Sequence, residues 1–197
     1  MSSLCGKRLR QLLTVSALAV LAACSDYNQA QQAYQAGDHK LAFERFEKLA
    51  KSGDVRAMLD LAQMYSQGIG RDPDPEMGWL WLRQAANAGN AAAMLEMGMR
   101  YESGIGAEQN FVMALTWYKK ASTAGNAVAR FNIATMYMMG QALPKDPVHA
   151  YAWFRFAKKA GSSAAIARMQ ALEKTMTPAE VEQAKALAEK LETNPDS

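Results

Sequence analysis

Histidine and cysteine side chains are the groups in this sequence best suited to acid–base, nucleophilic or metal chemistry, and they are scarce. The chain has His39, His149, Cys5 and Cys24. Neither histidine has a cysteine or a second histidine at metal-ligand spacing, and we expect both to face solvent just inside a helix start. The motifs Ser-x-x-Lys, Gly-x-Ser-x-Gly, His-Glu-x-x-His and the P-loop are absent from the sequence. The sequence therefore predicts a protein that is not an enzyme and that holds no metal and no cofactor.

A basic and then apolar segment opens the chain. Lys7, Arg8 and Arg10 precede an uncharged run over residues 12–22. This run is too short to span a membrane, which takes about 20 residues, but it has the pattern of a secretory signal. We expect residues 1–23 to be removed as a signal peptide. That removal takes away three basic side chains and no acidic one, which leaves 19 of each. The balanced charge argues against a nucleic-acid partner.

The residues that end this run, Leu21-Ala22-Ala23-Cys24, resemble the lipobox of bacterial lipoproteins. The resemblance implies that signal peptidase II cleaves before Cys24 and that its thiol carries a diacylglycerol. Several acyl chains, at about 0.8 kcal/mol per buried CH₂, anchor a protein more firmly than one short chain. The alternative is an ordinary secretory signal with an incidental cysteine. In many Gram-negative bacteria the inner-membrane retention signal resembles an acid directly after the lipid cysteine, whereas here Ser25 follows Cys24 and the acid, Asp26, stands one place later, a position that some species also read. This resemblance predicts an outer-membrane lipoprotein of a Gram-negative bacterium, facing the periplasm.

An internal repeat of 36 residues organises the rest of the chain. Sliding the sequence by this period aligns residues of one kind without a gap: Tyr65, Tyr101 and Tyr137; Gly68, Gly104 and Gly140; Trp81, Trp117 and Trp153; and Gly53, Gly89, Gly125 and Gly161. A fixed period of this length is typical of solenoid proteins, in which each unit buries its apolar face against its neighbours. We expect the aromatic columns to pack between layers rather than to bind a ligand.

Helix caps divide each period into two helices. A capping residue follows each glycine of the last column, namely Asp54, Asn90, Asn126 and Ser162, and a second cap column holds Asp38, Asp74, Asn110 and Asp146. These positions predict A helices over about 54–66, 90–102 and 126–138 and B helices over about 74–88, 110–124 and 146–160. A shorter pair precedes them over 26–36 and 38–52. A helix over 162–174 follows, and a last helix begins at the capping box of Thr177 and Glu180.

The repeated segments carry the motifs of a known family. Residues 57–65 (AMLDLAQMY), 68–70 (GIG) and 79–89 (WLWLRQAANAG) resemble a Sel1-like repeat, a relative of the tetratricopeptide repeat. The resemblance is strong over about 54–165 and implies an all-α, right-handed α/α superhelical solenoid that acts as an adaptor between proteins. We divide the chain into 1–23, a lipidated N-terminus with a divergent helix pair at 24–53, repeats at 54–89, 90–125 and 126–161, and capping helices at 162–197.

One stripe of the A helices varies from repeat to repeat, whereas the packing columns stay constant. Its members lie three and four positions apart and so share a helix face; they are Asp60, Gln63, Gln67, Glu96, Met99, Ser103, Asn132, Thr135 and Met139. We predict that this concave face binds protein or peptide partners of the cell envelope. Met58, Met64, Met94, Met97 and Met136 fall in core columns, whereas Met99 and Met139 are expected to be exposed.

The leading interpretation is therefore a membrane-anchored periplasmic scaffold. The alternative is an envelope enzyme or a β-lactam-binding protein, because some members of this family are associated with penicillin binding. The absence of Ser-x-x-Lys argues against acyl-enzyme chemistry but leaves binding open.

Overall fold

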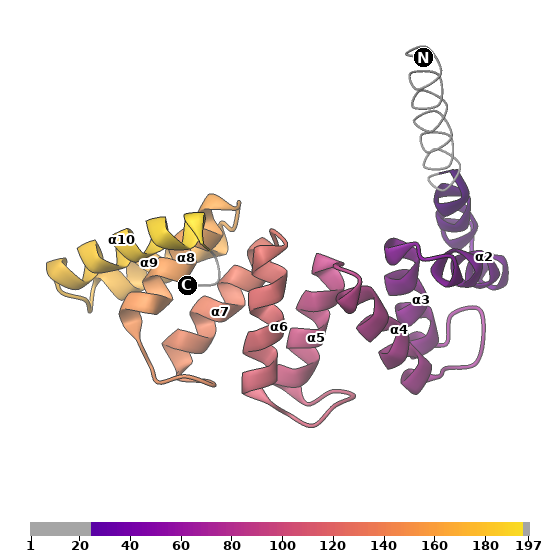
Figure 1. Cartoon of the computed structure of the whole chain (residues 1–197), viewed down its shortest axis with the longest axis horizontal. Helices are drawn as coiled ribbons and strands as arrows, with labels where there is room; N and C mark the ends of the chain where they lie inside the picture. Colours follow the sequence, from indigo (N-terminus) through magenta and orange to yellow (C-terminus); the bar gives the residue numbers. More distant parts are fainter. Residues whose placement is uncertain (1–24, 195–197) are drawn as a thin grey trace, which may run out of the picture. The chain divides into compact units, whose positions relative to one another are not determined.

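The computed structural model describes residues 25–194, and the regular elements in this range are all α-helices. A helical segment over 25–35 is followed by the helices labelled in Figure 1. Their bounds are α2 His39–Lys51, α3 Val55–Gln67, α4 Pro75–Asn87, α5 Ala91–Ser103, α6 Phe111–Thr123, α7 Ala127–Met139, α8 Pro147–Lys159, α9 Ala164–Glu173 and α10 Pro178–Thr193. The predicted all-α fold class is confirmed. The predicted signal peptide and Cys24 lie outside the described residues.

The chain divides into two compact units, residues 1–84 and 85–197, and the boundary falls inside α4. In the first unit, α2 packs against α3. Aromatic rings hold its core: Phe43 meets Tyr65 edge to face at 5.1 Å between ring centroids, and Tyr27 of segment 25–35 meets Phe46 of α2 at 5.7 Å. Such edge-to-face pairs are favoured by the ring quadrupoles.

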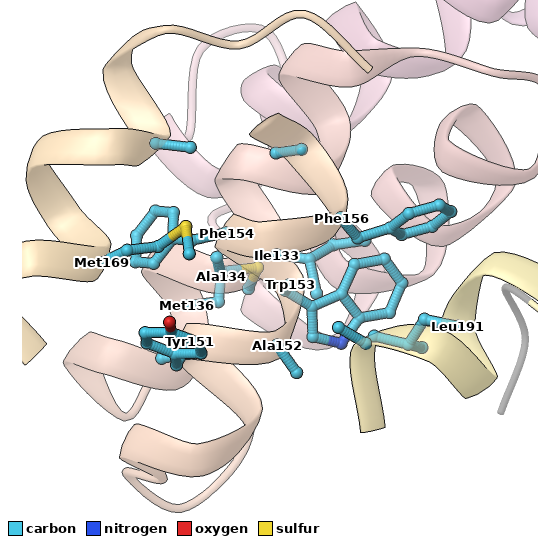
Figure 2. Close-up of a cluster of buried hydrophobic side chains, with 14 of the residues drawn as sticks. Ile133, Ala134, Met136, Tyr151, Ala152, Trp153, Phe154, Phe156, Met169 and Leu191 are labelled. Carbon is cyan, nitrogen blue, oxygen red and sulfur yellow. The ribbon is translucent and has the colours of Figure 1, made fainter. Parts of the chain in front are cut away.

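In the second unit, α5 packs against α6 and α7 against α8, and both α9 and α10 lie against α8. The core of this unit gathers on α8, where Trp153 and Phe154 are almost fully buried. Figure 2 shows the indole of Trp153 beside Leu191 of α10, and Met169 of α9 near Phe154. Because α8 is covered by three helices, its side chains are apolar around most of its circumference.

The helix caps lie where the sequence predicts them in each repeat. Asp54, Asn90 and Asn126 accept hydrogen bonds from backbone N–H groups in the first turns of α3, α5 and α7. The side chain of Thr177 and that of Glu180 form the predicted capping box of α10. Gly68, Gly104 and Gly140 end the A helices with φ angles of 71°, 76° and 76°, a left-handed conformation that glycine adopts without a steric penalty.

The start of α9 differs from the prediction. The sequence places a cap at Ser162, whereas α9 begins at Ala164 with Ser163 in the cap position. Ser163 has helical backbone angles, φ −67° and ψ −32°, and its side chain makes no capping hydrogen bond. An N-cap side chain typically reaches the free N–H groups from a non-helical backbone, so the cap column ends with the third repeat.

The tryptophan column is buried as the repeat predicts, whereas in the tyrosine column Tyr65 is buried and Tyr101 and Tyr137 are half-buried. Trp81, Trp117 and Trp153 are 8%, 6% and 1% exposed. The methionine predictions hold for Met64, Met97 and Met136, which are buried, and for Met99 and Met139, which are exposed, whereas Met58 and Met94 are half-buried.

Candidate interaction surface

An open groove of about 770 Å³ runs along α5 in the second unit. It is lined by Ala92, Leu95, Glu96, Met99, Arg100, Glu102 and Ser103 of α5, by Ile105 of the following loop and by Asn132 of α7. Glu96, Met99, Ser103 and Asn132 belong to the stripe that the sequence assigns to partner binding. We call this feature the α5 groove.

The apolar part of the α5 groove is open to solvent. Met99 is 49% exposed and Ile105 is 68% exposed. Leu95 lies beside them and is half-buried. Large apolar side chains that a fold leaves in water are typical of surfaces that bind another molecule, and methionine adapts its shape to many partners. The α5 groove therefore offers an apolar contact area.

The polar part of the α5 groove is held by bonds within the chain. Oε1 of Glu96 accepts hydrogen bonds from Nε and Nη2 of Arg100, at 3.0 and 2.7 Å. The hydroxyl of Tyr118 donates to Oε2 of Glu102 at 2.5 Å. Burial of the Tyr118 ring raises the pKa of its phenol, and the neighbouring Glu102 carboxylate raises it further, whereas a hydrogen bond with Asn132 lowers it. Tyr118 therefore stays a neutral donor that fixes Glu102 at the groove wall.

The remaining stripe residues of the second unit lie outside this groove. The hydroxyl of Thr135 donates to the carbonyl of Phe131 at 3.0 Å, so its polar group is used within α7. Met139 is 64% exposed at the end of α7. In this unit, four of the six predicted residues line the α5 groove, and the other two, Thr135 and Met139, lie outside it on α7.

In the first unit, Asp60 is engaged by the segment 25–35. The hydroxyl of Tyr27 donates to Oδ2 of Asp60 at 2.6 Å, and Nε2 of Gln31 donates to the same oxygen at 3.3 Å. Burial raises the pKa of Asp60, and burial together with the Asp60 carboxylate raises the pKa of Tyr27 to about 12. The guanidinium of Arg56 lies 4.1 Å from the centre of the Tyr27 ring. Asp60 therefore contributes to packing within its own unit.

The other two stripe residues of the first unit are separate from each other. Gln63 lines a small cavity of about 100 Å³ together with Gln31, Tyr34, Phe46, Asp60 and Met64. Gln67 is exposed at the end of α3 and does not line that cavity. A cavity of this size is smaller than the roughly 300 to 1,000 Å³ of ligand pockets.

Replacement of Tyr27 by phenylalanine tests the Tyr27–Asp60 contact. Because the folded chain raises the pKa of Tyr27 from 10.0 to about 12, this contact stabilises the fold fully below pH 10 and is lost as the pH rises from 10 to 12. We expect Tyr27→Phe to lower the free energy of unfolding by about 1 kcal/mol at neutral pH, the usual worth of one hydrogen bond. The difference from the parent should shrink above pH 10 in urea unfolding followed by circular dichroism. An equal difference at pH 8 and pH 12 would contradict the assignment.

The two histidines differ in their surroundings. His39 is exposed, as predicted, with its ring 5.2 Å from that of Tyr34. His149 is half-buried: its Nδ1 lies 2.7 Å from Oδ2 of Asp146, and its ring stacks on Tyr137 at 4.9 Å. The Asp146 carboxylate also accepts from the backbone N–H of His149, so this pair completes the cap of α8.

The described residues, 25–194, contain neither a metal-binding cluster nor a membrane-spanning helix. Within this range, no three His, Cys, Asp or Glu side chains are grouped in a way that could hold a metal ion. None of the helices described there combines the length and the apolar character that crossing a membrane requires.

Sequence reasoning missed several residues of the α5 groove. Leu95 belongs to a repeat column with Leu59 and Phe131. A column that is apolar in all three repeats indicates packing rather than binding. Ile105 follows the turn glycine Gly104. A large apolar residue in such a turn is a sequence signal that could have indicated a binding contact. Glu102 lies in a column that the stripe does not include, three positions beyond Met99 on the same helix face.

Helix pairs repeated along the chain, with an open groove along one A helix, define an all-α repeat protein. The Sel1 repeat model matches residues 55–90, 91–126 and 127–162, more than half of the chain, and the protein belongs to this family. Each match begins one residue later than the repeat boundaries drawn from the sequence. The Sel1 fold is typical of scaffolds for protein–protein interaction.

Solved structures show the same fold. A Sel1 repeat protein from Oxalobacter formigenes is 32% identical, with 64% of this chain and 94% of that chain covered and a TM-score of 0.61. A protective antigen present in uropathogenic Escherichia coli strains, which displays an SLR fold, is 25% identical with a TM-score of 0.74. That alignment covers 86% of this chain and 38% of the antigen. A search of curated protein sequences finds no match.

Proposed function

We propose that this protein is a membrane-anchored periplasmic scaffold that binds protein partners through the concave face of its A helices, and above all through the α5 groove. One observation carries the proposal: four residues that the repeat pattern assigns to binding line one open groove, beside the exposed side chains of Met99 and Ile105. Exposed apolar area bordered by charged groups is the usual composition of a protein interface.

Photocrosslinking in living cells tests this function. A photoreactive amino acid replaces Met99 in the full chain, and Val112, which is 63% exposed at the start of α6, serves as a matched apolar control. We expect a defined crosslinked partner from position 99 and none from position 112. Equal capture at both positions, or none at position 99, would place the binding surface elsewhere.

The anchor belongs to the same proposal and is supported by the residues Leu21-Ala22-Ala23-Cys24. We expect Cys24→Ser to abolish membrane association and to leave an uncleaved precursor, because the thiol is both the acyl acceptor and the cleavage signal. Cell fractionation with radiolabelled palmitate measures both effects, and Cys5→Ser is the matched control. Palmitate label retained by the Cys24 variant would contradict the lipid attachment.

Residence in the outer membrane is the final element of the proposal, and it is supported by Ser25 directly after Cys24. Separation of the two membranes on a density gradient tests it, with Ser25→Asp as the comparison. The parent should sediment with outer-membrane markers and the variant should move toward the inner membrane. A parent protein that sediments with inner-membrane markers would overturn this location.

A further inference from the structure

We propose that the α5 groove selects a partner segment in which a large aliphatic side chain stands next to a lysine or an arginine. This inference rests on the proposed scaffold function and names the chemistry of the partner. It follows from the charges and the apolar side chains that alternate along the exposed face of α5.

The groove carries a net negative charge. Its ionisable residues are Glu96, Glu102 and Arg100, which amount to two carboxylates and one guanidinium. Arg100 makes two hydrogen bonds to Glu96, and Glu102 is bonded by the neutral hydroxyl of Tyr118. A phenol that donates to a carboxylate leaves its negative charge in place. A cationic side chain of a partner would complement this wall, whereas an acidic one would be repelled.

The apolar contact lies between these charges. Met99 is three positions from Glu96 and three positions from Glu102, so the three side chains share one helix face. Leu95 and Ile105 extend the apolar area at either end of this face. An aliphatic side chain seated on Met99 therefore places its neighbours in the partner within reach of a carboxylate.

The open, elongated form of the groove favours a peptide segment over a small molecule. About 770 Å³ of open space along a 13-residue helix is room for several side chains in a row. Met99 and Ile105 remain 49% and 68% exposed, so a ligand must cover an extended surface rather than enter a closed pocket.

Selection from a random dodecapeptide library displayed on phage, against the full-length protein in detergent micelles, tests the proposal. We expect enrichment of peptides with lysine or arginine adjacent to leucine, isoleucine or methionine. The enriched peptides are then synthesised with a fluorescent label and titrated against the protein and its variants. Enrichment of acidic or uncharged sequences, or no enrichment, would overturn the inference.

Two variants locate the contact, each with a matched control. Glu102→Gln keeps the acceptor for Tyr118 but removes the charge, and we expect it to weaken peptide binding roughly three- to tenfold. Met99→Lys removes the apolar contact and repels the peptide, so we expect a loss of more than about tenfold. The controls are Glu76→Gln on α4 and Val112→Lys on α6, both outside the groove and outside the predicted binding stripe. Binding unchanged by Glu102→Gln or by Met99→Lys would overturn the inference.

Failure of the inference about partner chemistry can be distinguished from failure of the scaffold function. If position 99 still crosslinks a partner in cells while the selected peptides show no basic preference, the scaffold function stands and the inference about partner chemistry is wrong. If position 99 crosslinks nothing and no peptide is enriched, both are wrong.

Discussion

Replacement of Trp153 by alanine is expected to lower the free energy of unfolding by about 3 to 5 kcal/mol, the usual cost of truncating a large buried aromatic residue. The Trp153 side chain is 1% exposed, packs with its ring centroid 5.9 Å from that of Phe156 and lies beside Leu191 (Figure 2). Its removal leaves a cavity at the junction of α8 and α10 that the neighbouring helices cannot fill completely. A loss of this size is a large share of the roughly 5 to 15 kcal/mol of a typical domain.

Urea unfolding followed by far-ultraviolet circular dichroism measures this loss. Met139→Ala is the control, because Met139 is 64% exposed and exposed substitutions usually stay within about 0.5 kcal/mol of neutral. Trp117→Ala should lower the free energy of unfolding by less than Trp153→Ala does. The buried indole N–H of Trp117 has no hydrogen-bond acceptor among residues 25–194, and truncation also removes this unsatisfied donor. A Trp153 variant with the midpoint of the parent would contradict its role as an interlayer contact.

The repeat made much of the fold predictable, because residues at equivalent positions of each repeat have the same structural role. A capping residue after a glycine fixes where a helix begins, so the starts of α3, α5 and α7 agree with the structure. Burial of Trp81, Trp117 and Trp153 follows from their common place in the stack. The prediction of a cap at Ser162 was wrong, because α9 starts at Ala164 after Ser163, whose helical backbone angles go with the absence of a capping hydrogen bond.

The candidate site was predictable only in part. Variation between repeats identified Glu96 and Met99, because positions free of packing can change. The bond between Asp60 and Tyr27 was not predictable from the same pattern, because Tyr27 lies in the divergent pair and has no counterpart in the repeat columns. The contribution of Ile105 depends on how the loop after α5 turns back toward the helix, which spacing alone does not determine.

Gly98 of α5 packs closely against the ring of Tyr118, a contact that its repeat column alone does not identify. The position is occupied by Ala62, Gly98 and Ala134 in successive repeats, which indicates close approach of two helices. A methyl group on Gly98 would lie 2.5 Å from two carbons of the Tyr118 ring. That ring is completely buried and its hydroxyl is bonded to Glu102, so it has no free space into which to move.

We therefore expect Gly98→Ala to destabilise the second unit by about 1 to 3 kcal/mol, as overpacking of a core does. At an unconstrained helical site the same change would stabilise by about 1 kcal/mol, because alanine is the better helix former. The sign of the effect in urea unfolding thus reports the contact with Tyr118. A Gly98 variant more stable than the parent would show that the ring can yield.

The first repeat supplies the compensating change. There Ala62 stands in the Gly98 column and Leu82 in the Tyr118 column, and both are buried. Gly98→Ala combined with Tyr118→Leu should therefore be destabilised by less than the sum of the two single changes, because residues in direct contact are not additive. The double variant loses the hydrogen bond to Glu102, a half-exposed carboxylate that can turn to solvent. Strict additivity across this cycle would mean that Gly98 is required by the backbone of α5 rather than by the Tyr118 ring.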